Sequence, residues 1–546
     1  MDKTDSSKKT LINYVLCIAF FLALIYFYLP MTKHWFFSDD IQWIWSSASL
    51  SFREIFFVPE KYRAMASNFT PMLGASFKID WMLSGMNPLG YTLHSLLSLL
   101  AAAGALYCFL RLYVSGKTAF AGVLLFVLNP ITLSVTGWFS TRHYMEGLFW
   151  ALLSLTFFVK GERKGKVSIA SGIFYLLASL NKEVYVVLPA IALLLSGDRL
   201  LKRLTHTLPL WSGLVVYSLW RLWIMGGIGG YPSNQPLHFE TLIPLFLKTI
   251  KFFSLQWFGE YSIVLYLFLT VAFLLSLKKM KLLFIFLILS IPLLPVSNIF
   301  DAHYSMGRYF FHTSVFVICV LSLLLEPTSK ERALYKGALF LVCLFITAMF
   351  IKQDIRISAA MQSERLRAKE TAATFLSSGK RYINAEQPSW FYEGLRNIYS
   401  DFFSSEITTL LVPPEGFLRY ASPERLREIR ESGIGIPYDE IRESQRKFRK
   451  GPLTVRITLE GYKLIWDFGP RKDVTYTLLR GLASGLYYNS SDLRSTGNYM
   501  LGKGSEAPSS VYIRIFYRSE GGEEVISPEF ELTIPGSRKI EYISTR

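Results

Sequence analysis

The sequence predicts an all-α polytopic membrane bundle of about eleven transmembrane helices, followed by a soluble α+β domain that ends in a β-sandwich-like part. Three observations predict this fold class. The 546 residues are 51% hydrophobic and 16% aromatic, with a mean hydropathy of +0.31, which is too apolar for a typical soluble protein of this size. Clusters of Lys and Arg punctuate the apolar segments. After about residue 352 the composition changes abruptly to mixed polar and charged residues with Gly and Pro.

Membrane topology explains the basic excess. The chain has 58 Lys and Arg against 41 Asp and Glu, a formal net charge of +17. Such an excess can also indicate nucleic-acid binding, but these cations fall between apolar segments, as in cytoplasmic loops, and no nucleic-acid module is required. The clusters are Lys3/Lys8/Lys9, Arg111/Lys117, Lys160/Arg163/Lys164/Lys166, Arg199/Lys202/Arg203, Lys278/Lys279/Lys281 and Lys330/Arg332/Lys336.

The spans thread in one orientation when every basic cluster is placed in the cytoplasm. The N-terminus is then cytoplasmic, and eleven crossings of about 20 residues place the C-terminus outside. The first span is expected to stay uncleaved, because no small-residue cleavage site is evident after it. The crossings are expected near residues 11–30, 90–112, 118–136, 143–160, 167–181, 183–197, 207–226, 260–277, 281–299, 308–326 and 334–352. This transmembrane module occupies residues 1–352, with a large first outer loop at 31–89.

The apolar stretch at residues 242–258 does not fit this threading. If this stretch were a span, the basic cluster that begins at Lys278 would lie on the outer side. In addition, Lys248 and Lys251 interrupt the apolar stretch. We therefore expect an amphipathic helix at the outer interface with Trp257 as an anchor, and a tilted crossing remains open.

The remainder of the chain has the composition of a soluble region large enough for its own core. We expect a helical and mixed extracytoplasmic region at 353–450, which begins with a helix near 357–376. Residues 453–459 and 511–517 alternate in the manner of β-strands. This alternation predicts a β-rich extracytoplasmic domain at 451–546.

An adjacent carboxylate pair, Asp39-Asp40, follows the first span. Two like charges repel, and their desolvation near lipid is costly, so a cation, a substrate or abundant water must offset both effects. The pair is therefore a candidate catalytic base or metal ligand. The ordinary alternative is that one Asp caps a helix starting at Ile41, and both roles are compatible.

The threading gathers further polar residues on the same outer side. Ionisable groups at membrane depth usually face a bundle interior or a cavity, which makes them functional candidates. The set comprises Lys61, Tyr62, Arg63, Asn68, Trp138, Arg142, His143, Lys182, Glu183, Tyr231, His238, Glu240, Asp301, His303, Arg308 and Tyr309. Carboxylates beside cations suit the transfer of a group from a lipid-linked phosphate. A carboxylate deprotonates the acceptor hydroxyl or holds a metal, while Arg and Lys stabilise the phosphate leaving group.

Roles follow from these residue types. The expected phosphate-binding residues are Arg308, Lys182, Arg142 and Tyr309, and the expected acceptor or sugar contacts are Tyr62, Arg63, Trp138 and Glu183. Each has an ordinary alternative. An Arg at a span end can snorkel to lipid headgroups, Lys182-Glu183 can be an ion pair that closes a turn, and a Trp can belong to an aromatic belt. His94, within the second span, is expected to form an interhelical hydrogen bond.

Metal dependence stays open at this point. Two adjacent carboxylates are a thin ligand set, and the partners considered for Asp40 are His238 and Glu240, with His303 as a further one. A divalent cation such as Mg, Mn or Zn is compatible with such ligands. No other cofactor is indicated.

The order of these pieces resembles the GT-C class of polyprenyl-phosphate-sugar glycosyltransferases, in its bacterial mannosyltransferase-like and O-mannosyltransferase branch. The pieces are Asp39-Asp40, Asn87-Pro88-Leu89-Gly90-Tyr91-Thr92-Leu93-His94, Leu128-Asn129-Pro130, Trp138-Phe139-Ser140-Thr141-Arg142, Leu180-Asn181-Lys182-Glu183 and Gly307-Arg308-Tyr309-Phe310. The resemblance covers about residues 1–352. It implies a GT-C-like bundle, a dolichyl- or undecaprenyl-phosphate sugar donor, and the outer-loop carboxylates at the reaction centre.

The chain also departs from that branch. Its relatives often have Arg before the Pro that precedes the second span, where this chain has Phe69-Thr70-Pro71, so the resemblance does not carry over one expected phosphate or acceptor contact. No tetratricopeptide repeats follow the spans.

The sequence thus predicts an integral-membrane glycosyltransferase. It would move a hexosyl or mannosyl unit, with inversion, from a polyprenyl-phosphate donor to an extracytoplasmic glycan, lipid or protein acceptor. A bacterial inner membrane is the expected location, and nucleic acid is not an expected partner. Two alternatives stay open. One is a transporter or flippase of lipid-linked glycans, which predicts broken helices with mid-bilayer charges. The other is a non-catalytic membrane scaffold whose β domain binds a partner.

Overall fold

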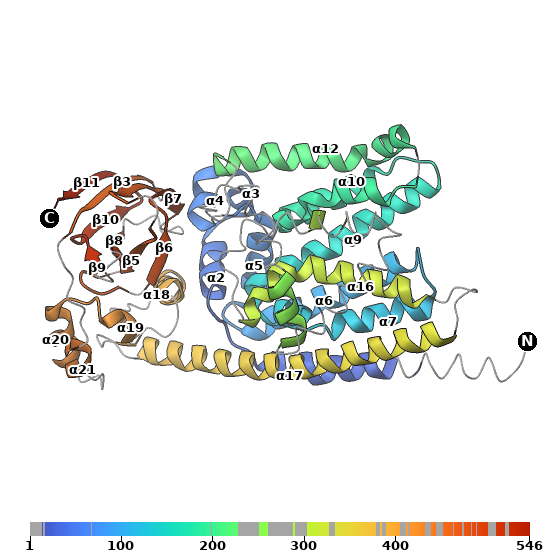
Figure 1. The fold of residues 1–546 in the computed structure, drawn as a ribbon, viewed down its shortest axis with the longest axis horizontal. Coiled ribbons are helices and arrows are strands. Elements are labelled where there is room, and N and C mark those ends of the chain that lie inside the picture. The colour runs from blue at the N-terminus through green and yellow to red at the C-terminus, as the bar shows by residue number, and fades with distance from the viewer. Residues whose placement is uncertain are drawn as a thin grey trace, which may run out of the picture. The chain divides into compact units, whose positions relative to one another are not determined.

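The computed structural model divides the chain into two compact units (Figure 1). The first unit comprises Met1–Trp35, Phe69–Ile228 and Leu237–Arg365, and the second comprises Phe36–Asn68, Gly229–Pro236 and Leu366–Arg546. The described residues are 17–227 without 67 and 198, 250–259, 303–326, 333–377, 383–384, 389–403, 411–412, 415–431, 438–443, and, with short gaps, 451–500 and 509–545, together with residues 14, 285, 288 and 289.

The first unit is helical. Its irregular helices are η1 (Leu24–Tyr28), η2 (Leu29–Lys33), η3 (Phe139–Thr141), η4 (Glu183–Val187) and η7 (Tyr304–Phe310). Its α-helices are α5 (Pro71–Ser84), α6 (Pro88–Leu110), α7 (Gly116–Val127), α8 (Pro130–Gly137), α9 (Arg142–Arg163), α10 (Ile169–Asn181), α11 (Leu188–Leu195), α12 (Leu200–Met225), α16 (Phe311–Leu325) and α17 (Ala333–Ser377), which continues into the second unit.

Two of these helices begin with the same Asn-Pro pair. Asn87 precedes α6 and accepts the Leu89 N–H at 3.1 Å, and Asn129 precedes α8 and accepts the Ile131 N–H at 2.9 Å. The proline at the first helical position has no N–H to satisfy, and the Asn side chain binds one of the remaining free donors. The local sequence therefore fixes where both helices start.

Fewer helices than predicted are long and apolar enough to cross a membrane. Among the described residues three qualify, Pro88–Leu110, Leu200–Met225 and Tyr304–Leu325, and α7 with α8 make a fourth if the pair, bent by 57°, is one span. These helices support an integral membrane protein. They do not support the predicted number of eleven crossings.

The difference has a physical reason. The apolar helices Cys17–Lys33, Ile169–Asn181 and Glu183–Leu195 have between 10 and 17 residues, which is short for a bilayer core of about 30 Å. Apolar runs that look continuous in sequence fold here as short or bent helices. The predicted spans at 260–277 and 281–299 lie outside the described residues, apart from positions 285, 288 and 289.

The last predicted span and the helix predicted near 357–376 form one continuous helix, α17, of 45 residues. The helix predicted near 357–376 is confirmed. The change in composition at residue 352 falls inside α17 and does not interrupt its backbone.

Trp257 corrects a second expectation. Residues 250–258 are helical, but Trp257 is fully buried in the apolar core of the first unit. Its Nε1 donates to the Ser314 hydroxyl at 3.2 Å, and its ring meets that of Phe350 at 5.0 Å, edge to face. The prediction that Trp257 is an interfacial anchor is wrong, because its indole is held inside the protein. Residues 242–249 lie outside the described residues.

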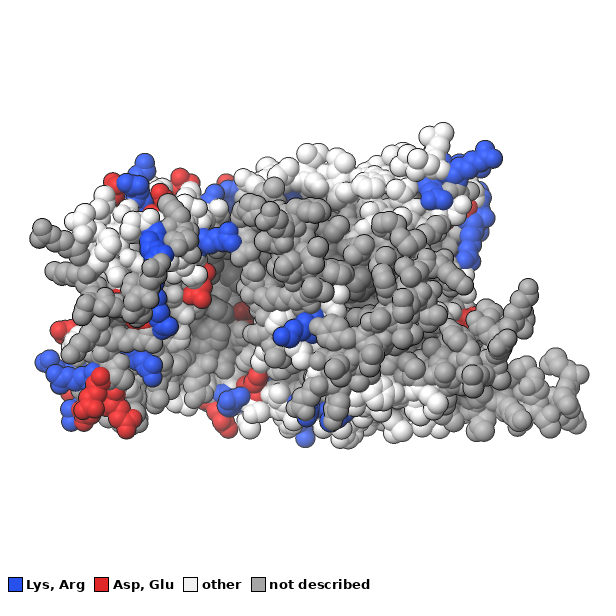
Figure 2. Space-filling model, viewed as in Figure 1, with Lys and Arg blue, Asp and Glu red and all other residues white. Residues whose placement is uncertain are grey.

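One end of the helical unit is basic. Arg163, at the end of α9, donates to the Leu112 carbonyl at 2.7 Å, and the Ser115 N–H donates to Glu326 Oε2 at 2.9 Å, so neighbouring helix ends are tied together there. Figure 2 shows Lys and Arg gathered near the start of α12. The predicted cytoplasmic clusters at Arg111/Lys117, Lys160 to Lys166 and Arg199 to Arg203 all belong to these helix ends. The other three clusters lie outside the described side chains.

In the second unit, helices from the first loop pack with a helix from the C-terminal region. The first-loop helices are α2 (Asp40–Ser49), α3 (Phe52–Phe57) and α4 (Pro59–Met65), and the C-terminal helix is α18 (Ser389–Phe403). The Trp45 Nε1 donates to Asp401 Oδ2 at 2.9 Å. A Cβ at Gly394 would lie 2.9 Å from the Ile41 side chain, so α18 approaches α2 closely. Segment 36–68 therefore folds with the C-terminal region.

The predicted β-sandwich-like part is present at the end of the chain. One antiparallel sheet has the order β10-β8-β5-β6, with β9 beside β8, and the other has the order β11-β3-β4-β7. The strands are β3 (Leu453–Gly461), β4 (Lys463–Gly469), β5 (Tyr476–Gly481), β6 (Asn489–Leu493), β7 (Thr496–Met500), β8 (Ser509–Arg518), β9 (Glu524–Ile526), β10 (Phe530–Ile534) and β11 (Gly536–Ser544).

Side chains from both sheets form one core. Val455 and Trp466 from one sheet and Leu478 and Ile513 from the other are buried together. The strands predicted at 453–459 and 511–517 are confirmed as β3 and β8. Between α17 and β3 lie α18, the short paired strands β1 (Ile383–Asn384) and β2 (Leu411–Val412), and the helices α19 (Glu415–Leu418), α20 (Pro423–Glu431) and α21 (Tyr438–Glu443).

Candidate functional site

Three irregular segments meet near the start of α9, at the end of this helix opposite to its basic end. They are the turn between α8 and η3, which carries Trp138, the extended break at Lys182 between α10 and η4, and η7, which carries Arg308 and Tyr309. The 22 residues of α9 separate its two ends by about 33 Å. Most of the residues predicted to bind the donor are therefore far from the basic loops.

Arg308 lies between two aromatic rings. Its guanidinium carbon is 4.8 Å from the centroid of the Trp138 ring and 4.5 Å from that of Tyr309. Its Nη1 donates to the Ser305 carbonyl at 2.7 Å, and its Nη2 donates to the Tyr309 hydroxyl at 3.1 Å. These four contacts are with neutral groups and fix the orientation of the guanidinium. The structure thus brings together three predicted site residues, Arg308, Tyr309 and Trp138.

Lys182 is buried at the break between α10 and η4. Its Nζ lies 3.1 Å from Glu183 Oε1 and 5.5 Å from the centroid of the Tyr144 ring. The ion pair considered as the ordinary alternative is therefore present. The second carboxylate oxygen of Glu183, Oε2, is buried and finds no hydrogen-bond partner among the described residues.

His143 is a buried residue beside Lys182: its ring lies 4.6 Å from that of Tyr144, the ring that Lys182 contacts. Its side chain is buried, and the positive charges of Lys182, Arg308 and Arg142 all act on its imidazole. The sequence placed His143 on the outer side but gave it no role, because a single His beside an Arg carries no specific signal. The structure places it near the predicted phosphate-binding cations.

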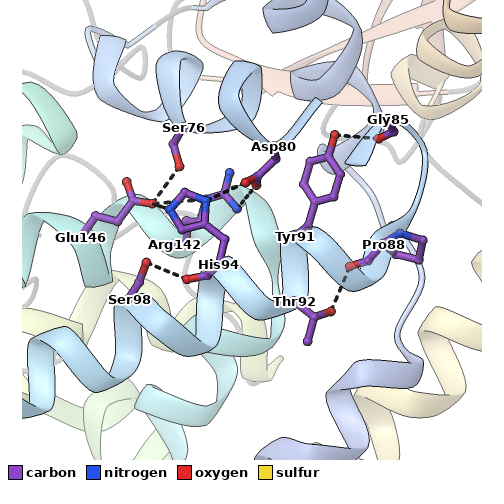
Figure 3. A network of polar contacts seen from close by, with 10 residues as sticks. All are labelled: Ser76, Asp80, Gly85, Pro88, Tyr91, Thr92, His94, Ser98, Arg142 and Glu146. Carbon is purple, nitrogen blue, oxygen red and sulfur yellow. Dashed lines mark hydrogen bonds and ion pairs between the residues drawn. The ribbon is translucent and has the colours of Figure 1, made fainter. Parts of the chain in front are cut away.

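Arg142 itself belongs to a buried charge network (Figure 3). Its side chain is fully buried, Nη1 pairs with Asp80 on α5, and Nε lies 3.3 Å from Glu146 Oε1, one turn along α9. The guanidinium also lies 4.7 Å from the centroid of the Phe77 ring. Two carboxylates therefore already balance the charge of Arg142.

His94 completes this network. Its Nδ1 lies 2.6 Å from Asp80 Oδ1 and its Nε2 lies 3.4 Å from Glu146 Oε1, while the Ser76 hydroxyl donates to Glu146 at 2.8 Å. The prediction that His94 forms an interhelical hydrogen bond is confirmed. The sequence analysis missed Asp80 and Glu146. A usable signal existed, since each carboxylate is surrounded by apolar residues in sequence and Glu146 is four residues from Arg142.

Asp39 and Asp40 lie at the start of α2 in the second unit. Asp40 is fully buried, and its Oδ2 accepts the Phe37 N–H at 2.9 Å. Asp39 is half-buried, accepts a hydrogen bond from the Ser38 hydroxyl at 3.3 Å, and occupies the N-cap position. Ser38 has a φ of +49°, a conformation that a non-glycine residue rarely adopts. Strain of this kind often accompanies functional sites.

Tyr62 and Arg63 lie on α4, also in the second unit. Tyr62 is fully buried, and its hydroxyl donates to the Asn68 carbonyl at 2.7 Å. This bond closes the segment that follows α4. Arg63 is half-buried.

The predicted metal ligands are only partly described. His238 and Glu240 lie outside the described residues, as do Tyr231 and Asp301. The described part of the chain contains no group of three or more His, Cys, Asp or Glu side chains placed to hold a metal ion. His303, the further partner considered, pairs instead with Glu364, with 3.0 Å between Nε2 and Oε1.

An apolar cavity of about 140 Å³ lies beside the predicted phosphate-binding cations. Its lining comes from α6, α9, η4, α11 and α16 and includes Tyr185, which follows Lys182 by three residues. At the other extreme it includes Tyr113 and Leu323, near the basic end. The cavity thus has lining residues both near the candidate phosphate-binding residues and near the opposite helix ends.

Comparisons with known proteins give distant likenesses. No family model and no curated protein matches the sequence. The fold is similar to that of ArnT from Cupriavidus metallidurans bound to undecaprenyl phosphate, with 13% identity, a TM-score of 0.43, and coverage of 74% of this chain and 90% of that chain. The apo state of the same protein has 14% identity and a TM-score of 0.42, with coverage of 72% of this chain and 85% of that chain. The Archaeoglobus fulgidus oligosaccharyltransferase in complex with Zn and sulfate has 11% identity and a TM-score of 0.43, with coverage of 77% of this chain and 66% of that chain. Likenesses this distant assign neither a family nor an activity.

Proposed function

We propose that this chain is an integral-membrane glycosyltransferase that moves a monosaccharide from a polyprenyl-phosphate donor to an extracytoplasmic acceptor. One observation carries the proposal. Two cations set against aromatic rings, Arg308 and Lys182, lie at the end of α9 away from the basic loops. A phosphate leaving group gains negative charge as its bond to the sugar breaks, and such cations stabilise it. The sequence resemblance to the GT-C class agrees with this reaction.

The apolar cavity supports a lipid-linked donor. A polyprenyl chain needs an apolar surface that continues from the site of its phosphate. The cavity lining supplies Tyr185, Leu188 and Ile191, which follow Lys182 along the chain, and continues to Leu323. We place part of the donor hydrocarbon chain there, with its phosphate at Arg308 and Lys182.

The charge network changes the role proposed for one residue. Because Arg142 is paired with Asp80 and Glu146, we assign it to anchoring the start of α9. Phosphate binding falls to Arg308 and Lys182, with Tyr309 orienting Arg308. Trp138 and Glu183, with Tyr62 and Arg63 from the second unit, remain the proposed sugar and acceptor contacts.

The reaction itself is assigned to the aspartate pair. Asp40 or Asp39 takes the proton of the acceptor hydroxyl, and the oxygen attacks the anomeric carbon. The bond from that carbon to the phosphate oxygen breaks and releases polyprenyl phosphate. Direct displacement inverts the anomeric centre. A divalent cation at Asp40, with His238 and Glu240, is a further part of the proposal. The expected sugar is a hexose such as mannose, and the expected setting is a bacterial inner membrane with the N-terminus inside.

Sugar transfer in liposomes tests the proposal. The purified chain is given a panel of radiolabelled polyprenyl-phosphate hexoses and candidate acceptors. We expect Asp40→Asn and Arg308→Gln each to lower kcat/KM about 100-fold, equivalent to about 2.7 kcal/mol of transition-state stabilisation. Asp439→Asn and Arg199→Gln change exposed residues and should leave the rate unchanged. Wild-type rates in Asp39→Asn, Asp40→Asn and Arg308→Gln together would refute the catalytic assignment.

A further inference from the structure

Two adjacent residues of α17, Glu364 and Arg365, reach the two segments that carry Arg308 and Trp138. Both residues lie beyond the last predicted span, in the part of α17 that belongs to the first unit. The cation and the ring that meet at 4.8 Å come from segments about 170 residues apart in sequence, so something must hold each segment in place.

Glu364 holds the segment of Arg308. Its Oε1 lies 3.0 Å from His303 Nε2, and its Oε2 accepts a hydrogen bond from the Tyr304 hydroxyl. The other ring nitrogen of His303 lies 2.8 Å from the Ser305 hydroxyl, and the Ser305 carbonyl accepts from Arg308 Nη1 at 2.7 Å. A continuous series of polar contacts therefore runs from Glu364 to the guanidinium of Arg308.

Arg365 holds the segment of Trp138. Its buried guanidinium donates from Nη2 to the Gly137 carbonyl at 2.6 Å and lies 5.7 Å from the centroid of the Phe139 ring. Gly137 and Phe139 flank Trp138 on both sides. The methyl carbon of Met361, one turn earlier on α17, would lie 1.7 Å from a Cβ at Gly137, so the Met361 side chain packs directly against this turn.

We propose that Glu364 and Arg365 are positioning residues that fix the two partners of the Arg308–Trp138 pair, one residue for each partner. The catalytic consequence rests on the proposed function, since it requires Arg308 to bind the donor phosphate. A cation–π contact needs the guanidinium over the ring face within about 6 Å, and a binding site gains from having both partners fixed before the ligand arrives. Neither residue is proposed to touch the donor.

The first experiment measures the environment of Trp138 in the Arg308–Trp138 pair and needs no substrate. The chain has 12 Trp, and incorporation of 5-fluorotryptophan with a Trp138→Phe variant identifies the fluorine resonance of Trp138. We expect Arg308→Gln, Glu364→Gln and Arg365→Lys each to shift this resonance. Glu370→Gln and Arg367→Gln, at exposed positions of the same helix, should not shift it. An unshifted Trp138 resonance in folded Glu364→Gln and Arg365→Lys proteins would overturn the proposal.

The second experiment links the positioning to transfer. We expect Glu364→Gln to lower kcat/KM for a polyprenyl-phosphate hexose about 10-fold in the wild-type background but less than about twofold in the Arg308→Gln background. Equal losses in both backgrounds would show that Glu364 does not act through Arg308 and would overturn the proposal. Absence of transfer by the wild-type protein would instead defeat the proposed function, and the fluorine measurement would still decide the positioning.

Discussion

Arg142, Asp80 and Glu146 place one positive and two negative charges inside the helical unit. Removing charges from water is costly, and their mutual attraction repays that cost only when each charge keeps its partner. Arg142 Nη1 pairs with Asp80, and Nε lies 3.3 Å from Glu146. The start of α9 is therefore anchored to α5 by groups that cannot be removed singly without leaving a buried charge.

Asp80→Asn is expected to destabilise the protein by about 3 kcal/mol, because Arg142 would keep its buried charge with only one carboxylate nearby. The measurement is thermal unfolding in detergent, followed by circular dichroism. The double variant Asp80→Asn/Arg142→Gln removes both charges and should lose less stability than the sum of the two single variants. Additive losses would mean that Asp80 and Arg142 do not stabilise each other.

The stability of the folded protein is expected to depend on pH through Glu364. Burial raises its pKa, but hydrogen bonds from His303 and Tyr304, with the charges of His303 and Arg365, lower the pKa of this carboxyl overall below its usual value of 4.5. A carboxyl whose pKa is lower in the folded state adds stability above its unfolded pKa and loses it as the pH falls through the folded value. Wild type should therefore unfold at a higher temperature than Glu364→Gln at pH 7, and the gap should close below about pH 4.5. A gap that stays constant down to pH 3 would contradict this assignment.

At the scale of single elements, α7 and α8 form a bent pair whose second helix leads to Trp138. The bend of 57° occurs at Leu128-Asn129, where Asn129 is fully buried and caps α8 by accepting the Ile131 N–H at 2.9 Å. The direction of α8 therefore depends on one side chain that has almost no access to water.

Asn129→Ala is expected to cost about 1 kcal/mol of stability, the usual cost of losing an N-cap, while Asn129→Ser should retain a cap without adding a buried charge. Unfolding temperature and transfer activity are the two readouts, since a misdirected α8 would also displace Trp138. Asn87→Ala removes the equivalent cap of α6 and provides a matched comparison. Equal stability of Asn129→Ala and Asn129→Ser would show that the cap does not matter.

The sequence was most informative where the pattern is local. Residues 453–459 alternate with a period of two, and that alternation alone identifies β3. Span prediction worked for α6 and α16, whose apolar runs are long and uninterrupted. It placed the break at Lys182 correctly, but α10 and η4 with α11 have only between 10 and 17 residues each and are short for a bilayer core.

The site was less predictable for a related reason. Asp80 and Arg142 are 62 positions apart in sequence, and no pattern in either segment predicts that the two side chains pair. Single residues with unusual chemistry, such as Arg308 and Lys182, could be picked out as candidates. Their neighbours in the fold, His143, Glu364 and Arg365, could not be identified from the sequence, because only long-range packing brings them together.

At the scale of the whole molecule, segment 36–68 and the C-terminal region form one unit although about 300 residues separate them in sequence. Their packing depends on the close approach of α18 to α2, where a Cβ at Gly394 would lie 2.9 Å from the Ile41 side chain and 3.2 Å from the Gln42 backbone. Segment 36–68, bound in this way, is part of the second unit and carries Asp39 and Asp40 with it.

Gly394→Val should therefore loosen α2 and reduce transfer activity at least about 10-fold, with a stability loss of about 1–3 kcal/mol typical of overpacking. Gly394→Ala adds a smaller group and should have a smaller effect on both. Limited proteolysis of the α2 to α4 segment measures the loosening directly. If Gly394→Val resists protease as wild type does and transfers sugar normally, α18 does not control the placement of α2.

The length of α17 has one more consequence. Its 45 residues form a single helix of about 68 Å, more than twice the thickness of a bilayer core. In a single helix the direction of each side chain depends on the number of residues before it, because each residue advances the backbone by about 100° around the helix axis. One extra residue inserted after Arg365 would turn the α17 side chains that follow it by about 100° around the helix axis, whereas four extra residues would return them to within about 40° of their original directions and lengthen the helix by about 6 Å.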